Sequence, residues 1–255
     1  MRKRRLIADF ELSKSIFWAW STGKQYLGYH QLLEPQKMIS LHWKWEGEGE
    51  EVHHIHWGLK AQDDKRVVKK AIELFDLADE IVMHNGDKFD LKKLYGRAMF
   101  HQLPMRPKYI TRDTMKMVKS VASLPSYSLK FLCQHFGLPL KLDSGGSATW
   151  DKVQFEKSQE ALDHLLFYGD GDITSTEHLF NHIKTYCLNK QHYGEEKFFC
   201  PECNGLGKWN KSYTTASKTH LHYFKCRDKS CSTYWKINNK TYMDFLQYKM
   251  VNGIK

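Results

Sequence analysis

The chain has 255 residues, of which 41% are hydrophobic and 14% aromatic, and it carries a formal net charge of +10 at pH 7. This composition places it among globular proteins, with room for one core plus a small appendage or for two modest domains. The basic residues are spread along the chain rather than confined to a tail, which favours a polyanionic partner such as nucleic acid.

The first apolar run, residues 6–12, predicts a central strand that carries two acids. Alternation along a strand places Asp9 and Glu11 on one face and Ala8 and Phe10 on the other. Two neighbouring acids on a buried strand repel each other unless a counter-charge is present, and a divalent cation is the usual one. An edge strand with its acids in water is the alternative that this run alone favours.

Residues 15–20 and 38–45 are rich in aromatic and apolar side chains and predict two further strands. After a glycine-containing turn, residues 52–57 predict another strand, so these segments form an antiparallel meander. His54 and His56 share a face at strand spacing. Because no carboxylate or cysteine accompanies them in the sequence, we interpret them as surface residues and not as metal ligands.

A helix, a short strand and a second helix follow. A period near 3.6 predicts a helix over residues 63–78, residues 80–85 form a short apolar strand, and a helix runs from about 89 to 100. Asp90 therefore lies in the first turn of a helix that follows a core strand, where α/β proteins place their chemistry. A favourable interaction with the helix dipole is the alternative role for this acid.

The pattern up to residue 187 completes an α/β unit. It predicts a strand at 109–114, short helices at 114–122 and 128–136, a loop at 142–147 and a long amphipathic helix at 158–186. Within the long helix, Tyr168 and Asp172 are four residues apart and share one face. Gly169 and Gly171 each cost about 1 kcal/mol relative to alanine in a helix, which indicates close packing or the approach of a ligand.

Four acids in these elements are placed to converge on one edge of the sheet: Asp9, Glu11, Asp90 and Asp172. Carboxylates gather in this way only when cations neutralise them. Two Mg²⁺ or Mn²⁺ ions about 3.5 to 4 Å apart form the arrangement that activates water in phosphodiester hydrolysis. The sequence therefore predicts a two-metal site.

Four ordered stretches carry a specific resemblance: Asp-Phe-Glu at 9–11, His-Asn-Gly-Asp-Lys-Phe-Asp at 84–90, Leu-Pro-Ser-Tyr-Ser-Leu at 124–129 and Tyr-Gly-Asp-Gly-Asp at 168–172. The chain resembles a DEDD-type 3′-5′ exonuclease of the ribonuclease H-like superfamily, of the bacterial and phage type that carries a C-terminal zinc ribbon. The resemblance covers about residues 4–187. Phe167 stands where one branch of the family has histidine and Tyr168 follows it, which implies the DEDDy (DnaQ-like) form.

The resemblance implies a role for each catalytic residue. Asp9 would bridge both metals, Glu11 and Asp172 would complete the shell of the inner metal, and Asp90 would hold the second metal largely through water. Tyr168 would orient the attacking water. A phenol with a pKa of about 10 is a poor base at neutral pH, so proton abstraction falls mainly to the metal.

The chain also departs from the family pattern. The threonine that usually follows the second acid is Leu12 here. Asp170 competes with Asp172 for the ligand position, and we keep Asp172 because it shares a face with Tyr168. In the second stretch, Asn85 is expected to contact nucleic acid.

Two pairs of cysteines near the C-terminus predict one structural Zn²⁺: Cys200 with Cys203, and Cys226 with Cys231. A segment this small needs the metal for its stability. The wide spacing of the second pair leaves His220 and His222 as alternative ligands. This cysteine pattern favours a metal site in a reducing compartment over a disulfide framework.

Lysines and arginines alternate with aromatic residues in this segment, which suits phosphate contacts and base stacking along single-stranded nucleic acid. The residues expected to make these contacts are Lys208, Trp209, Lys225 and Trp235. A contact surface for another protein is the alternative use of the ribbon.

We therefore expect an α/β domain at residues 1–191, with a ribonuclease H-like mixed sheet flanked by helices, followed by a zinc-ribbon domain at 192–255. The expected function is a two-metal-ion 3′-5′ exonuclease on single-stranded 3′ ends, with DNA favoured over RNA. The alternatives are a ribonuclease or structure-selective nuclease on the same site, and an inactive adaptor that binds nucleic acid or a polymerase.

The expected partners are nucleic acid and a polymerase or another replication or repair protein. We expect no signal peptide, because acids interrupt the short apolar stretch after residues 1–5, and no stretch approaches the length of a membrane span. The expected location is the cytoplasm, which would be that of the host cell if the protein comes from a phage.

Overall fold

The computed structural model describes residues 3–139, 146–187 and 196–254. It divides into two compact units. The larger comprises Arg4–Lys119 and Leu124–Phe180, and the smaller contains the described residues from Asn181 onward together with Lys3 and Ser120–Ser123. The expected domain boundary at residue 191 and most of the expected loop at 142–147 lie outside the described residues.

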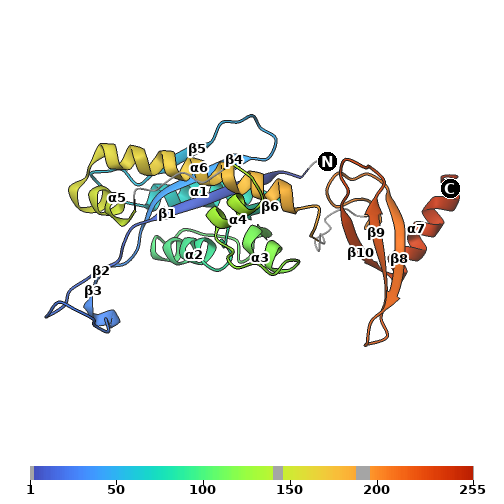
Figure 1. The fold of residues 1–255 in the computed structure, drawn as a ribbon, viewed down its shortest axis with the longest axis horizontal. Helices are drawn as coiled ribbons and strands as arrows, with labels where there is room; N and C mark the ends of the chain where they lie inside the picture. The colour runs from blue at the N-terminus through green and yellow to red at the C-terminus, as the bar shows by residue number, and fades with distance from the viewer. Residues whose placement is uncertain (1–2, 140–145, 188–195, 255) are drawn as a thin grey trace. The chain divides into compact units, whose positions relative to one another are not determined.

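Within the described part of the larger unit, five strands form a mixed sheet in the order β5-β4-β1-β6-β7. Figure 1 labels β1, β4, β5 and β6 of this sheet. The strands are β1 (Arg5–Leu12), β4 (Met38–Trp45), β5 (His53–His56), β6 (Glu80–Met83) and β7 (Thr111–Asp113). β1 pairs antiparallel with β4 and parallel with β6, and β6 pairs parallel with β7. The expectation that the first acidic strand is central is therefore confirmed.

The helices of this unit are α1 (Lys65–Leu77), α2 (Asp90–Phe100), α3 (Thr114–Lys119), α4 (Leu129–His135), α5 (Ser147–Asp151), the π-helix η2 (Lys152–Glu156) and α6 (Gln159–Ile183). The Ser128 hydroxyl caps α4 by accepting the N–H of Phe131, and Gly137 ends the helix with a φ of 65°. The sequence pattern did not predict α5 or η2.

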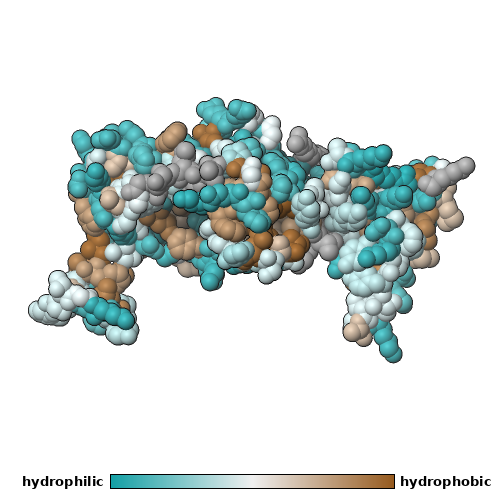
Figure 2. All heavy atoms as spheres, viewed as in Figure 1, coloured by the Kyte–Doolittle hydropathy of each residue, from teal (hydrophilic) through white to brown (hydrophobic). Residues whose placement is uncertain are grey.

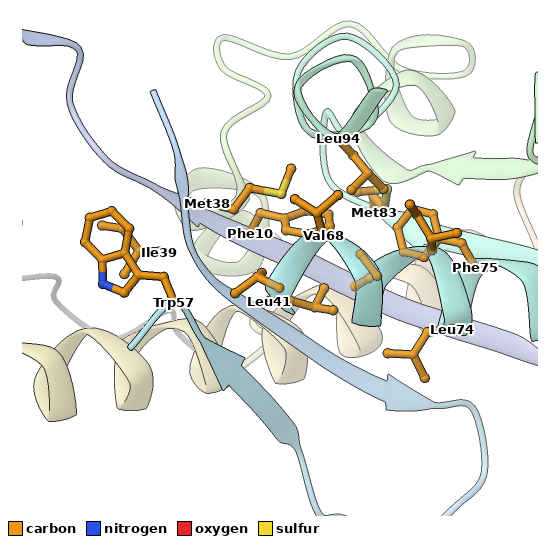
Figure 3. Close-up of a cluster of buried hydrophobic side chains, with 14 of the residues drawn as sticks. Phe10, Met38, Ile39, Leu41, Trp57, Val68, Leu74, Phe75, Met83 and Leu94 are labelled. Atoms are coloured by element: carbon orange, nitrogen blue, oxygen red, sulfur yellow. The ribbon is translucent and has the colours of Figure 1, made fainter. Parts of the chain in front are cut away.

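The two faces of the sheet bury different residues. Phe10, Leu41 and Met83 point toward α1 and α2, where they pack against side chains such as Phe75 and Leu94 (Figure 3). On the opposite face, Ile7 and Val82 pack against Ile173 and Phe180 of α6. Because side chains alternate along β1, Asp9 and Glu11 lie on the face that α6 covers.

The segment between β1 and β4 forms an arm. Its strands β2 (Ile16–Phe17) and β3 (Leu32–Glu34) pair only with each other, and the 3₁₀ helix η1 (Tyr29–Gln31) precedes β3. The strand expected at 15–20 is therefore wrong beyond Phe17. The stretch pairs with β3 of the arm and not with β4, because β1 and β5 already flank β4 on both sides. The arm projects from the rest of the larger unit (Figure 2). Its aromatic rings include two that are almost fully in solvent, with Trp20 90% and Tyr26 97% exposed.

In the smaller unit, β8 (Gly207–Thr214), β9 (His220–Cys226) and β10 (Tyr234–Asn238) form an antiparallel sheet. The helix α7 (Asn239–Val251), which the sequence pattern did not predict, follows it. The core of this unit contains Phe224, Phe245 and Trp235. Trp235 is 1% exposed and its indole N–H donates to the Lys197 carbonyl at 2.9 Å. The expectation that Trp235 stacks on nucleic acid is therefore wrong, because its ring faces are covered.

The expected fold class is confirmed: a mixed sheet flanked by helices is followed by a small ribbon with clustered cysteines. None of the described helices combines the length and the apolar character that crossing a membrane requires.

Candidate metal centre

Three acids from β1 and α6 form a compact group. Carboxylate oxygens of Asp9, Glu11 and Asp172 all lie within 4.8 Å of one another, and Glu11 and Asp172 are buried. β1 presents its two acids on one face, and the packing of α6 against that face brings Asp172 to them. A ligand set made only of carboxylate oxygens suits hard divalent cations such as Mg²⁺ and Mn²⁺.

The fourth expected acid, Asp90, begins α2 after β6. β6 runs parallel to β1, so the two strands end at the same edge of the sheet. The chain turns at Asn85, which has a φ of 61°, and at Gly86, where an added Cβ would lie 2.4 Å from the Cβ of Met83. This tight turn places Asp90 in the first turn of α2, although Asp90 is outside the group of three acids.

Asp90 is 4% exposed, and its burial raises the pKa of its carboxyl to about 7, with a smaller contribution from the charge of Asp113. A buried carboxyl in this state loses its proton readily when a cation binds beside it. Asp90 is thus suited to a site that has to accept a positive charge.

Asp113 has a structural role in the same region. Its carboxylate accepts the backbone N–H groups of Asn85 at 3.1 Å and Asp87 at 3.3 Å, and that of Lys116 at 3.2 Å. These bonds fix the turn that precedes Asp90 and cap the start of α3.

Tyr168 lies one turn before Asp172 on α6 and is 8% exposed. Its ring packs edge-to-face with Trp150, with ring centroids 6.2 Å apart. Asp170 does not join Asp9 and Glu11; the structure places Asp172 with them instead.

Asp170 belongs to a second group, with His42 of β4 and His54 of β5. Its Oδ1 lies 2.8 Å from His42 Nδ1, and its Oδ2 lies 3.0 Å from His54 Nδ1. The sequence interpretation that no carboxylate accompanies His54 is therefore wrong, because the carboxylate comes from a helix more than 100 residues away in the chain. Burial lowers the pKa of His42, although the hydrogen bond with Asp170 acts in the opposite direction.

The sequence held one unused signal for this group. Ser40, His42 and Lys44 occupy alternate positions of an otherwise apolar strand, and all three are buried. Polar residues at a spacing of two on a buried strand indicate a polar surface beneath a covering element.

In the smaller unit, the four expected cysteines gather. The Sγ atoms of Cys200 and Cys231 are 3.6 Å apart, those of Cys203 and Cys226 are 3.5 Å apart, and all four lie within 4.8 Å of one another. Four sulfur ligands fit a tetrahedral zinc ion. Burial raises the pKa of the Cys200 thiol and raises that of Cys226 to about 12.

The two histidines considered as substitute ligands point elsewhere. The His222 ring contacts Ser212 Oγ at 2.7 Å and Asn239 Oδ1 at 3.1 Å, and His220 contacts Thr214 Oγ1 at 2.9 Å. Neither histidine belongs to the cysteine group.

A basic hollow of about 730 Å³ opens on the smaller unit. Its lining includes Lys208, Trp209 and Lys225, three of the residues expected to contact nucleic acid, together with Arg227 and Lys249. Trp209 is 44% exposed, so its ring is accessible.

A family model described as the RNase_H superfamily matches residues 32–184, a stretch that contains Asp90, Tyr168 and Asp172. The comparison with curated proteins found no match. Among solved structures, the chain is similar to the family B DNA polymerase from the hyperthermophilic archaeon Pyrobaculum calidifontis, with 18% identity and a TM-score of 0.54 over 73% of this chain. The chain spans only 25% of that polymerase, and the likeness shows a shared fold.

Proposed function

Because the chain belongs to the RNase H superfamily, we propose that it is a nuclease, and specifically a DEDDy-type 3′-5′ exonuclease that acts on single-stranded DNA. The observation that carries this proposal is the group formed by Asp9, Glu11 and Asp172, which gathers three oxygen ligands from β1 and α6. The family and the fold support a nuclease.

Asp9, Glu11, Asp90 and Asp172 would hold two Mg²⁺ or Mn²⁺ ions, which when bound activate water and neutralise charge at the scissile phosphate. The raised pKa of Asp90 fits this role, since the site has to release protons before it accepts cations. Tyr168 would orient the attacking water from the next turn of α6.

The smaller unit would bind the single-stranded nucleic acid. We propose that residues 192–255 form a ribbon domain that follows a nuclease domain at 1–191, with one Zn²⁺ held by the cysteine group. The cations and the exposed Trp209 of the basic hollow suit phosphate and base contacts. Exposed rings on the arm, including Trp20 and Tyr29, add surfaces on which bases can stack.

Asn85 would contact the nucleic acid from the turn before α2. We place the activity in the cytoplasm, which would be that of the host if the gene belongs to a bacteriophage, and propose a polymerase or another replication or repair protein as a partner.

The experiment that tests the proposal is incubation of the purified protein with 5′-labelled and 3′-labelled strands of DNA and RNA, in Mg²⁺, in Mn²⁺ and in EDTA. A ladder that shortens from the 3′ end of DNA with metal, and no cleavage in EDTA, is expected. Faster cleavage of RNA would identify a ribonuclease, and internal cuts at junctions would identify a structure-selective nuclease. Binding without any cleavage would identify an adaptor and overturn the proposal.

A further inference from the structure

A row of polar side chains crosses three strands of the main sheet. β1 pairs Asp9 with His42 of β4, and β4 pairs His42 with His54 of β5. Directly opposed residues on neighbouring strands point to the same face of a sheet. The row therefore continues from the acids of β1 to two histidines, on the face that α6 covers.

α6 supplies one carboxylate to each end of this row. Asp172 joins Asp9 and Glu11, whereas Asp170 joins the histidines, with 2.8 Å between its Oδ1 and His42 Nδ1 and 3.0 Å between its Oδ2 and His54 Nδ1. A tetrahedral ion with bonds of about 2.1 Å holds its donor atoms roughly 3.4 Å apart. Measured from the single oxygen Oδ1 of Asp170, the distances are 2.8 Å to His42 Nδ1 and 3.2 Å to His54 Nδ1, and one ligand atom from each of the three residues lies within 4.8 Å of the others. A metal ion would therefore enter this group with movements of about half an ångström.

The surroundings fix the His42 ring in an orientation that suits a ligand. A Cβ at Gly169 would lie 2.4 Å from His42 Nε2, so the backbone of α6 rests on the ring, and this explains a glycine inside the helix. The ring is fully buried, and Ser40 Oγ lies 2.8 Å from Nε2. When Nε2–H donates to Ser40, the Nδ1 lone pair faces Asp170, the arrangement in which a metal-bound histidine is held by its second nitrogen.

The chemistry of the group selects the ion. Two imidazole nitrogens and one carboxylate oxygen favour Zn²⁺ and its neighbours in the transition series over Mg²⁺ or Ca²⁺. The side chains of His54 and Asp170 are 37% and 26% exposed, so an ion can enter from solvent, and three protein ligands leave a fourth position open. We propose that His42, His54 and Asp170 bind a zinc ion at a site separate from the acidic group and from the cysteine group.

The test counts zinc in the full chain. Protein with a zinc-loaded ribbon is dialysed against trace Zn²⁺ and a large excess of Mg²⁺, so that the oxygen-only site holds Mg²⁺, and metal content is then measured. Two equivalents of zinc are expected for the wild type and one for His54→Ala and for Asp170→Asn. His53→Ala is the matched control, because His53 neighbours His54 but its side chain is 49% exposed and lies 3.8 Å from Glu51; it should retain two equivalents.

Cobalt provides a second measurement on the same proteins. Co²⁺ added to the chain with one zinc in the ribbon should give visible absorption without thiolate charge transfer in the wild type and in His53→Ala, and none in His54→Ala. A wild type with a single zinc equivalent, or a His54→Ala variant that keeps the second, overturns the inference and leaves the contacts as hydrogen bonds. Because the readout is metal content, a protein with two zinc ions but no cleavage would overturn only the nuclease proposal.

Discussion

The acidic group of the larger unit and the cysteine group of the smaller unit both gather ligands of one kind, but their supports differ. Asp9, Glu11 and Asp172 project from β1 and α6, two long elements that pack in an extensive core. Among the cysteines, Cys226 ends β9, while Cys200, Cys203 and Cys231 lie outside the described strands and helices, next to a much smaller core.

This difference leads us to propose that binding of a cation would serve two purposes. The larger unit has an extensive apolar core, so we expect its metals to serve chemistry and not folding. The smaller unit would gain stability from a metal, because fewer apolar side chains are available to it. Removing a ligand should therefore impair activity in one unit and folding in the other.

The largest effect is expected at the acidic group. Asp9→Asn and Asp172→Asn each remove a charged ligand. We expect the cleavage rate to fall by roughly 10³ or more, which corresponds to the loss of several kcal/mol of transition-state stabilisation. The far-ultraviolet spectrum and melting temperature should stay close to those of the wild type. Asp163→Asn, which changes an exposed acid on the same helix, is the control and should stay fully active. Activity within tenfold of wild type in both site variants would refute the assignment.

The second effect concerns the ribbon. Cys200→Ser combined with Cys203→Ser removes two of four sulfur ligands, so about one zinc equivalent per chain should be lost and the smaller unit should unfold. Limited proteolysis would detect the unfolding, and cleavage of short oligonucleotides should persist. Cys133→Ala removes a buried thiol of the larger unit and should keep the zinc. Loss of all cleavage in the double variant would show that the acidic group of the larger unit depends on the folding of the smaller unit.

A third prediction concerns an acid that stabilises the larger unit without a metal. Asp64 is 1% exposed and accepts bonds from Arg97 Nε at 2.6 Å, Arg97 Nη2 at 2.7 Å and the Met38 N–H at 2.9 Å. Asp64→Asn should lower the free energy of unfolding by about 3 kcal/mol at pH 7, because it leaves a buried guanidinium poorly paired. Asp63→Asn, at an exposed neighbour, should cost less than about 1 kcal/mol.

The stabilisation by Asp64 should also depend on pH in a definite direction. Burial of Asp64 acts to raise its pKa, but the bonds from Arg97, Met38 and His101 outweigh it and leave the pKa below its usual value. The stabilisation is thus complete above the unfolded pKa of about 3.9 and is lost as the pH falls through the folded value. Urea unfolding of wild type and Asp64→Asn should converge in acid; a constant difference down to pH 2 would contradict this.

A smaller loss of activity is expected at Tyr168. Tyr168→Phe removes only the hydroxyl proposed to orient water, so the rate should fall by roughly 10² while Mn²⁺ affinity is unchanged. Isothermal titration with Mn²⁺ separates the two roles. A loss of affinity as large as that of Asp172→Asn would assign Tyr168 to metal binding instead.

The smallest effect is expected in the basic hollow. Lys208→Ser with Lys225→Ser should weaken binding to long single strands and flatten the salt dependence by about 1.4 in log–log slope, at about 0.7 per lost phosphate contact. Lys218→Asn with Lys240→Ser removes the same charge outside the hollow and should leave the slope nearly unchanged. Equal slopes for the two double variants would show that the hollow makes no special contact.

Local sequence determined much of the larger unit. Alternation placed Asp9 and Glu11 on one face of a central strand, and helical spacing put Asp172 with Tyr168, because both patterns depend only on backbone geometry. The two ends of α4 could also be predicted from the sequence, because Ser128 and Gly137 act on their immediate neighbours. The cysteine pairs predicted a cluster because four soft ligands at such spacing have few other uses.

Only the tertiary structure decided the rest, and in each case the missing information was the identity of a distant neighbour. The stretch from 15 to 20 reads as a strand, but β5 and β1 occupy both edges of β4. The sequence predicts Trp235 as a residue that stacks on bases, whereas in the structure it is buried in a core with Phe224 and Phe245. His54 does lie at the surface, with a side chain that is 37% exposed. Its partners His42 and Asp170 could not be predicted, because they are fixed by strand register and by the packing of α6, which no local pattern encodes.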